Sequence, residues 1–176
     1  MAEEYKGVKF QIINIQKIID EDSILRFLNI DKILRAFLSP SANEGNLSMR
    51  YKNGFLIKRA GSKLTMLQPE DVVFVDRVID NKVFATGNAS SESIMHYEIY
   101  RARADATIVL HFHDDVLLKK RFQYEVGPFS YGTRELATAV ADVATRSNLI
   151  KIREHGFVLI TRDSEELKNA ISRLKR

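Results

Sequence analysis

The chain of 176 residues contains no cysteine and no tryptophan. The lack of cysteine excludes disulfides, thiolate metal ligands and a cysteine nucleophile. No apolar run is long enough to span a bilayer, and nothing near the amino terminus resembles a signal peptide, so we expect a cytoplasmic protein. Basic residues are interleaved with acidic ones and form no stripe with stacking aromatic residues, which disfavours nucleic acid binding and leaves a small molecule as the expected partner.

The composition is that of a globular domain with a sizeable core. Hydrophobic residues make up 45% of the chain and charged residues 28%. At this length we expect one domain, spanning residues 1–176. The formal net charge of +4 suits an anionic substrate, although a solvated surface explains it equally well.

Residues 107–113 alternate in a way that is typical of a strand. Because successive side chains point to opposite faces, the apolar side chains would share one face and leave His111 and His113 together on the other. Two imidazoles at this spacing can converge on one cation, but the same pattern occurs in sheets without metal, so a third ligand is needed. The candidate is His155, beside Gly156 at a strand break where a bulge could re-aim its side chain.

A helix is predicted just before this strand. Ser90 or Ser91 is the expected N-cap, and the buried stripe would comprise Met95, Ile99 and Ala102. Glu92 at the helix start has two interpretations. It either complements the positive helix end, or it faces a metal while the serines hold an anion.

Two small-residue corners flank a predicted hairpin, whose strands at residues 47–51 and 55–58 surround Asn53-Gly54. Glycine lets a backbone N–H approach an anion, so Gly45-Asn46 and Ala60-Gly61-Ser62 are candidate anion loops, with ordinary turns as the alternative. Further strands are expected at residues 8–15, 72–75, 77–79, 82–85, 149–152 and 157–161. Helices are expected near residues 22–39, either one bent helix or two ended by Pro40, and after the predicted N-caps Thr133 and Asp163.

Three histidines around a divalent metal leave an open coordination position. Such a metal polarises a carbonyl, and a carboxylate beside it can move a proton at the neighbouring carbon. This set suits carbon–carbon bond chemistry, and metal-assisted hydrolysis equally well. Imidazole ligands favour zinc, with cobalt, nickel, iron and copper as alternatives. We expect the fourth histidine, His96, only to pack beside the site.

From about residue 33 onward the chain resembles the class II aldolase/adducin family. The resemblance rests on four segments in order: GNLSMRYKNGFLIKRAG, SSESIMHYEIYRARADATIVLHFH, YGTREL and REHGFVLI. It implies a three-layer α/β/α sandwich with a mixed, mainly antiparallel sheet. Residues 1–32 have no counterpart and are expected to form an N-terminal extension packed on the domain. By resemblance, the zinc ligands are His111, His113 and His155, the catalytic acid/base is Glu92, and the phosphate-binding residues are Gly45, Asn46, Gly61, Ser90 and Ser91.

The function that this resemblance implies is a zinc-dependent aldolase. It would cleave a small phosphorylated sugar similar to fuculose 1-phosphate into dihydroxyacetone phosphate and an aldehyde, with Glu92 moving the proton. The related 4-epimerases typically have aspartate at that position, which favours the aldolase, whereas sugar-phosphate dehydratases also have glutamate. An epimerase, a dehydratase and a non-catalytic binding domain of the adducin-head type are the alternatives. The resemblance also implies a homo-oligomer, with a tetramer favoured and sites at subunit interfaces.

The chain departs from the family pattern in two places. The phosphate loop usually reads Thr-Pro-[Ser/Thr]-Gly, whereas residues 58–61 read Lys-Arg-Ala-Gly, which loses a hydroxyl and adds positive charge. The stretch between His113 and His155 is about twenty residues shorter than is typical, and loops vary most in length. The family often supplies a tyrosine from this stretch to a neighbouring subunit, and Tyr124 and Tyr131 are the candidates here.

Overall fold

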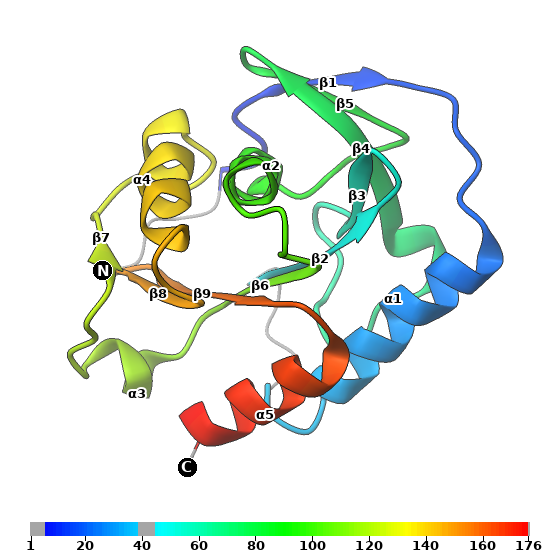
Figure 1. Cartoon of the computed structure of the whole chain (residues 1–176). Helices are drawn as coiled ribbons and strands as arrows, with labels where there is room; N and C mark the ends of the chain where they lie inside the picture. Colours follow the sequence, from blue (N-terminus) through cyan, green and yellow to red (C-terminus); the bar gives the residue numbers. More distant parts are fainter. Residues whose placement is uncertain (1–5, 39–44, 176) are drawn as a thin grey trace.

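The computed structural model describes residues 6–38 and 45–175, and it is built on one nine-stranded sheet (Figure 1). The strand order is β1-β5-β4-β3-β2-β6-β9-β8-β7, and only the pairs β1/β5 and β7/β8 are parallel. The strands are β1 Gln11–Asn14, β2 Asn46–Tyr51, β3 Gly54–Lys58, β4 Val72–Ile79, β5 Lys82–Ala85, β6 Ile108–Phe112, β7 Glu125–Val126, β8 Leu149–Ile152 and β9 Gly156–Thr161.

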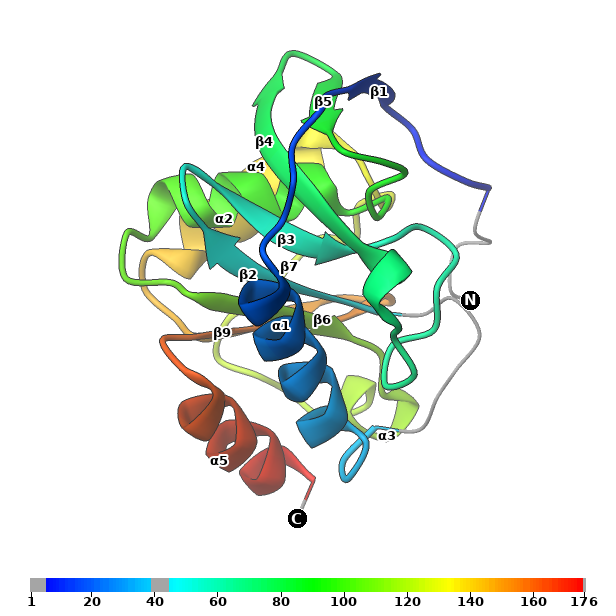
Figure 2. The same cartoon turned by 90° about the vertical axis from the view of Figure 1, so that its right-hand side faces the viewer.

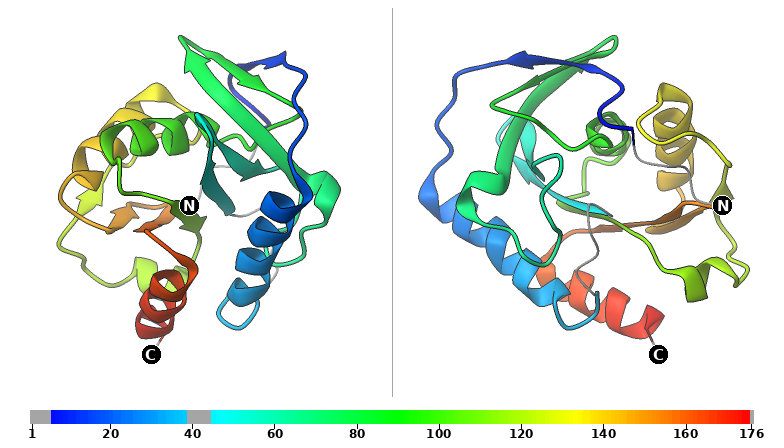
Figure 3. Two further views of the ribbon diagram at one scale, coloured as in Figure 1. Left: turned by 45° about the vertical axis from the view of Figure 1, so that its right-hand side comes forward. Right: turned by 180° about the vertical axis from the view of Figure 1, so that it is seen from behind.

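Helices cover both faces of this sheet (Figure 2). They are α1 Glu21–Leu34, α2 Ser93–Ala102, α3 Asp115–Leu118, α4 Arg134–Ala144 and α5 Ser164–Leu174, with a 3-10 turn at Pro69–Asp71. Helices α2 and α4 lie on one face, while α1 and α5 lie side by side on the other (Figure 3). The three-layer sandwich with a mixed, mainly antiparallel sheet is therefore confirmed. Among the described residues, no helix has the length and apolar character needed to cross a bilayer.

The central strand β6 separates two apolar cores. Ile108, Leu110 and Phe112 pack with α1 and α5, and Val109 packs with α2 and α4. The predicted alternation is confirmed, although both faces of β6 are buried. His111 therefore lies on the α2 side, within the layer that also holds the start of that helix.

The region before the first hairpin differs from prediction in its boundaries. α1 is a single helix, capped by Asp20, whose side chain accepts a hydrogen bond from the Ser23 backbone N–H at 2.9 Å. Asp31 lies inside this helix rather than at a cap. It is buried and accepts hydrogen bonds from the backbone N–H groups of Thr65 (2.6 Å) and Leu67 (3.1 Å). The predicted stop at Pro40 lies outside the described residues.

Two further expectations about strands need correction. Strand β1 is shorter than predicted, and residues 72–79 form one strand instead of two. The pairing of β4 with β5 shifts register between Val75 and Arg77, so a bulge there allows the strand to continue. The caps at Thr133 and Asp163 are confirmed, because their side chains accept hydrogen bonds from the N–H groups of Leu136 and Glu166.

The start of α2 was predicted wrongly. Its N-cap is Glu92, and neither Ser90 nor Ser91 caps the helix. The reason is that the preceding backbone is held by β3, since the Ser90 N–H donates to the Lys58 carbonyl at 3.1 Å. Ala102 is exposed and does not belong to the buried stripe.

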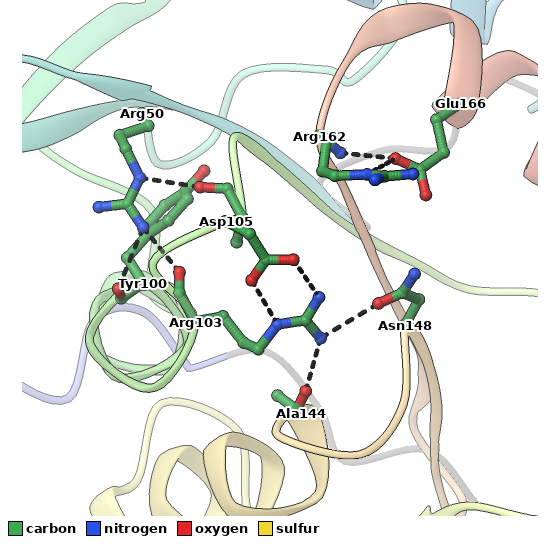
Figure 4. A network of polar contacts seen from close by, with 9 residues as sticks. Arg50, Tyr100, Arg103, Asp105, Ala144, Asn148, Arg162 and Glu166 are labelled. Carbon is green, nitrogen blue, oxygen red and sulfur yellow. Dashed lines mark hydrogen bonds and ion pairs between the residues drawn. The ribbon is translucent and has the colours of Figure 1, made fainter.

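The other end of α2 is held by arginine side chains (Figure 4). Arg50 from β2 donates to the backbone carbonyls of Tyr100 (3.1 Å), Arg103 (2.8 Å) and Ala106 (2.8 Å). The Arg103 guanidinium makes two 2.7 Å bonds to Asp105 and also reaches the Ala144 carbonyl and the Asn148 side chain. These bonds satisfy carbonyls that a helix end leaves without partners, and they fix the connection from α2 to β6.

Candidate metal centre

Three histidines converge where the inner strand β6 ends and the inner strand β9 begins. His111 is in β6, His113 directly follows it, and His155 lies in the turn between β8 and β9. Their potential ligand nitrogens all lie within 4.8 Å of one another. The Nε2 atoms of His111 and His113 are 3.0 Å apart. The structure thus brings together the three histidines that the sequence analysis selected.

The orientation of His111 is fixed by the neighbouring strand. Its Nδ1 is 3.0 Å from the Phe157 carbonyl oxygen. Because a carbonyl can only accept, Nδ1 carries the proton and the neutral ring presents its Nε2 lone pair to the cluster. Burial, and then the neighbouring His155, His113 and His96, lower the pKa of His111 well below its usual value, which keeps the ring neutral.

His155 reaches the cluster from a tight turn, not from the predicted bulge. Ile152 pairs with Gly156, the His155 N–H donates to the Ile152 carbonyl at 3.1 Å, and Glu154 adopts a left-handed φ of 61°. A Cβ at Gly156 would lie 3.0 Å from the His113 ring and 3.1 Å from the His111 ring. Glycine at this position is therefore what allows the imidazoles to pack against the turn.

Glu92 lies beside the histidines, at the start of α2. Its side chain is buried, and its Oε2 atom is 3.9 Å from His111 Nε2. Its other oxygen, Oε1, accepts a hydrogen bond from the Gly132 backbone N–H at 3.2 Å. The carboxylate is thus oriented with one oxygen toward the histidines and the other against the chain before α4. The bond from Gly132 was not anticipated, although YGTREL was among the segments that carried the resemblance.

His96 has a more defined place than packing alone. It is fully buried one turn after Glu92, and its Nδ1 is 2.6 Å from the Ser48 hydroxyl, which also lies 2.9 Å from the Tyr100 hydroxyl. Burial lowers the pKa of His96 to about 3, so this ring is neutral as well. These hydrogen bonds connect Ser48 of β2 to His96 and Tyr100 of α2.

The five candidate phosphate-binding residues are linked to the same region by backbone contacts. Asn46, after Gly45, pairs with His111 across β2 and β6. The turn at Gly61 lies next to the segment that leads to Ser90 and Ser91, because the Ala60 N–H donates to the Asn88 carbonyl at 2.8 Å. Asn46 is buried, and its Oδ1 accepts no hydrogen bond from the described part of the chain. A buried acceptor of this kind is suited to a bound ligand or water.

The two added cations of the loop do not act alike. The Lys58 ammonium is buried and donates to the carbonyls of Ser62 (2.5 Å) and Arg59 (3.3 Å), so it holds its own loop. Burial lowers the pKa of Lys58 to about 8. Arg59 is exposed. Asp114 directly follows His113, and its side chain caps α3 by accepting hydrogen bonds from the N–H groups of Val116 and Leu117.

The donor set fits a zinc-like cation. In a tetrahedral zinc site with Zn–N bonds of 2.0–2.1 Å, neighbouring ligand nitrogens are about 3.3 Å apart. The 3.0 Å between His111 Nε2 and His113 Nε2 is close to this value. Three imidazoles would leave a fourth coordination position open, and Glu92 lies beside the cluster.

Comparisons with known proteins match this architecture. Residues 38–119 match the family model of the class II aldolase and adducin N-terminal domain. L-fuculose phosphate aldolase of Methanococcus vannielii is 32% identical over 134 residues, which cover 66% of this chain and 71% of that protein. The chain belongs to the class II aldolase/adducin family. The crystal structure of L-fuculose-1-phosphate aldolase from Thermus thermophilus superposes with a TM-score of 0.71 at 25% identity, over 86% of this chain and 88% of the other.

The chain spans about three fifths of the length of one curated relative that it matches. L-fuculose phosphate aldolase of Haemophilus influenzae is 29% identical over 136 residues, which are 65% of this chain but only 61% of that protein. In this chain, residues 114–133 return directly to the site and place Gly132 on Glu92. Of the two tyrosines that the sequence analysis named between His113 and His155, Tyr131 is buried beside Gly132, and its hydroxyl contacts residues 6 and 7.

Proposed function

We propose that this protein is a metal-dependent aldolase, with zinc as the expected metal, that cleaves a small ketose phosphate into dihydroxyacetone phosphate and an aldehyde. The observation that carries the proposal is the position of Glu92, a buried carboxylate whose Oε2 lies 3.9 Å from His111 Nε2 within a convergent three-histidine cluster. The family, and the names of its L-fuculose phosphate aldolase members, support the same reaction class.

His111, His113 and His155 would hold the metal, which when bound supplies a Lewis acid for a carbonyl oxygen. Glu92 would act as the acid/base. In the cleavage direction the carboxylate would take the proton of the hydroxyl that becomes the aldehyde oxygen. The carbon–carbon bond breaks, and the carboxyl group then gives that proton to the carbon that has lost the aldehyde. The synthetic direction follows the same steps in reverse. The Gly132 N–H keeps the carboxylate turned toward the reacting carbon during both steps.

The substrate phosphate would bind where the chain has backbone N–H groups and small polar side chains. Gly45, Asn46, Gly61, Ser90 and Ser91 are the residues proposed for this role. Within the described residues nothing donates to Asn46 Oδ1, so this oxygen can accept a hydrogen bond from a substrate hydroxyl or from water. Arg59 is exposed in the same loop as Gly61. Its positive charge favours an anionic substrate.

The test begins with metal content and product analysis. Protein reconstituted with zinc is expected to bind about one ion per chain, and His113→Ala to bind none. L-fuculose 1-phosphate is the first substrate to assay, with dihydroxyacetone phosphate measured by coupled reduction. Dihydroxyacetone phosphate that forms together with an aldehyde supports the aldolase. An inverted pentulose phosphate would identify an epimerase, and loss of water a dehydratase.

The matched variants are Glu92→Gln and Glu98→Gln, which alter one carboxylate at the start of α2 and one in its middle. Glu98 pairs with Arg101 near the surface. We expect turnover to disappear only in Glu92→Gln, with zinc retained in both. A fully active Glu92→Gln enzyme would remove Glu92 from the mechanism. Protein that takes up no zinc would contradict the metal-dependent reaction and leave a binding domain as the better interpretation.

A further inference from the structure

The amino-terminal segment lies directly on the loop that contacts Glu92. We call residues 6–10 the N-terminal strap and residues 127–133 the site loop. At the start of the described chain, the strap lies beyond the ends at which α2 and α4 begin (Figure 2). The Lys6 N–H donates to the Tyr131 hydroxyl at 2.6 Å, and that hydroxyl donates to the Gly7 carbonyl at 3.1 Å. The Lys9 ammonium lies over the Tyr131 ring, 3.9 Å from its centroid.

The strap is itself anchored to the sheet. Phe10 is buried in the core between the sheet and helices α2 and α4. The Asn81 side chain donates to the Lys9 carbonyl at 3.0 Å, and the Gln11 N–H donates to the Asn81 carbonyl at 2.9 Å. In the same turn, the Asp80 carbonyl accepts a hydrogen bond from Arg134 at the start of α4. One turn, between β4 and β5, therefore fixes both the strap and the chain that follows the site loop.

Tyr131 transmits this restraint to the base through the next residue. Gly132 has a φ of 67°, and a Cβ there would lie 2.8 Å from the Ser91 carbonyl oxygen and 3.9 Å from the Lys9 Cβ. The backbone is thus enclosed between the strap and the residue before Glu92, with its N–H 3.2 Å from Glu92 Oε1. Few other positions of the loop would keep this hydrogen bond.

We propose that the N-terminal strap is a positioning element for the catalytic carboxylate, and that it acts through the Tyr131 hydroxyl and the Gly132 N–H. The inference rests on the role of Glu92 proposed above. Tyr131 and the strap are connected to Glu92 through the neighbouring Gly132 N–H. Their effect is on the orientation of Glu92, which makes them positioning residues. The segment without a recognised family counterpart thereby gains a role in the reaction.

The variant Tyr131→Phe tests this chain of contacts, with Tyr51→Phe as its matched control. Both remove one hydroxyl that ties the amino-terminal region to the domain, because the Tyr51 hydroxyl donates to Asp20 at 2.7 Å. Tyr51 is not part of the series of contacts that runs from the strap through Tyr131 and Gly132 to Glu92. We expect Tyr131→Phe to lower kcat about five- to tenfold with little change in KM or zinc content, as one hydrogen bond is worth about 1 kcal/mol. Tyr51→Phe should leave kcat unchanged.

A second readout does not depend on turnover. The chain has eight glycines, so a glycine-selective ¹⁵N spectrum of the zinc-loaded protein is simple, and the Gly132 signal is identified by its loss in Gly132→Ala. We expect this signal to shift, and its amide exchange to accelerate, in Tyr131→Phe and in Glu92→Gln, but not in Tyr51→Phe. A second strap variant, Gly7→Ala, should produce the same shift as Tyr131→Phe. It strains a left-handed φ of 91° without placing a Cβ against any atom within 4 Å.

The outcomes separate the two proposals. An unchanged Gly132 signal and unchanged kcat in both Tyr131→Phe and Gly7→Ala would overturn the strap, whatever the substrate. A parallel loss of kcat in Tyr51→Phe would also overturn it, since the effect would then be general destabilisation. Full activity of Glu92→Gln, by contrast, would overturn the proposed function while the spectrum still reports the contact.

Discussion

The two ends of α2 show how differently one helix can be restrained. At the carboxyl end, Arg50 and Arg103 make charge-assisted hydrogen bonds to backbone carbonyls and to Asp105 (Figure 4). At the amino end, Glu92 is the N-cap but its side chain does not cap the helix, and it points instead toward His111. One end is held by hydrogen bonds to side chains, while the other lacks a side-chain cap and directs a carboxylate toward the histidines.

The largest effect should come from removing the metal site at the amino end. A His113→Ala enzyme is expected to lose at least about a thousandfold in kcat/KM, since a Lewis acid supplies several kcal/mol. Addition of a chelator to the wild type should reproduce this loss, and zinc should reverse it. Activity that resists both treatments would contradict a metal-dependent reaction at this end of α2.

Loss of the carboxylate alone should be the next largest effect. Glu92→Gln is expected to lower kcat about a hundred- to ten-thousandfold, the range for a general acid or base. Its stability toward urea should equal or exceed that of the wild type, because a buried charge is replaced by a neutral amide of the same shape. A strongly destabilised variant would show instead that Glu92 serves the fold in the same way as the arginines at the other end.

The carboxyl end should show the opposite behaviour. Arg50→Leu removes three side-chain hydrogen bonds to backbone carbonyls and is expected to lower the free energy of unfolding by about 3 kcal/mol. The kcat per folded, zinc-loaded molecule should be unchanged. Urea unfolding and steady-state kinetics on the same samples test both statements. The variant Arg50→Lys should be intermediate, since lysine cannot reproduce the forked geometry.

The smallest effect should be a change in acid stability. The Arg103 guanidinium lowers the pKa of Asp105 from 3.8 to about 2, and Arg162 adds to the shift. Since the folded pKa is lower than the unfolded one, this stabilisation is present above about pH 4 and disappears as the pH falls toward 2. As the pH falls from about 4 to 2, the free energy of unfolding of Asp105→Asn should therefore decrease less than that of the wild type. As a control, Asp142→Asn removes an exposed partner of Arg146 and should change it less.

The sequence predicted which side chains meet at the amino end of α2 better than it predicted the backbone that carries them. Alternation in residues 107–113 was sufficient to place His111 and His113 on one face, because the strand period leaves no other choice. The N-cap of α2 was wrong because long-range pairing of Ser90 with Lys58 overrides the local preference of serine. The bulge in β4 and the turn at His155 also depend on pairing partners that local sequence does not contain.

The backbone contacts that orient Glu92 were not predictable at all. The Gly132 N–H is a donor that any residue type possesses, so no side-chain pattern distinguishes it. The role of the strap could not be seen either, since Lys6 and Tyr131 are 125 residues apart and contact each other only in the folded chain. By comparison, the Asp163 cap was predicted correctly because its partner is three residues away.

The alternation of β6 also determines which changes of length this protein can tolerate. One face of the strand contributes Leu110 and Phe112 to a core, and the other contributes Val109 and His111 to the opposite layer. Deletion of a single residue within β6 would move each later side chain of the strand to the opposite face. His111 would then point toward α5 and Phe112 toward α2. The protein should therefore not tolerate the insertion or deletion of a single residue within β6. The connection that follows, residues 114–133, can change in length without exchanging the two faces.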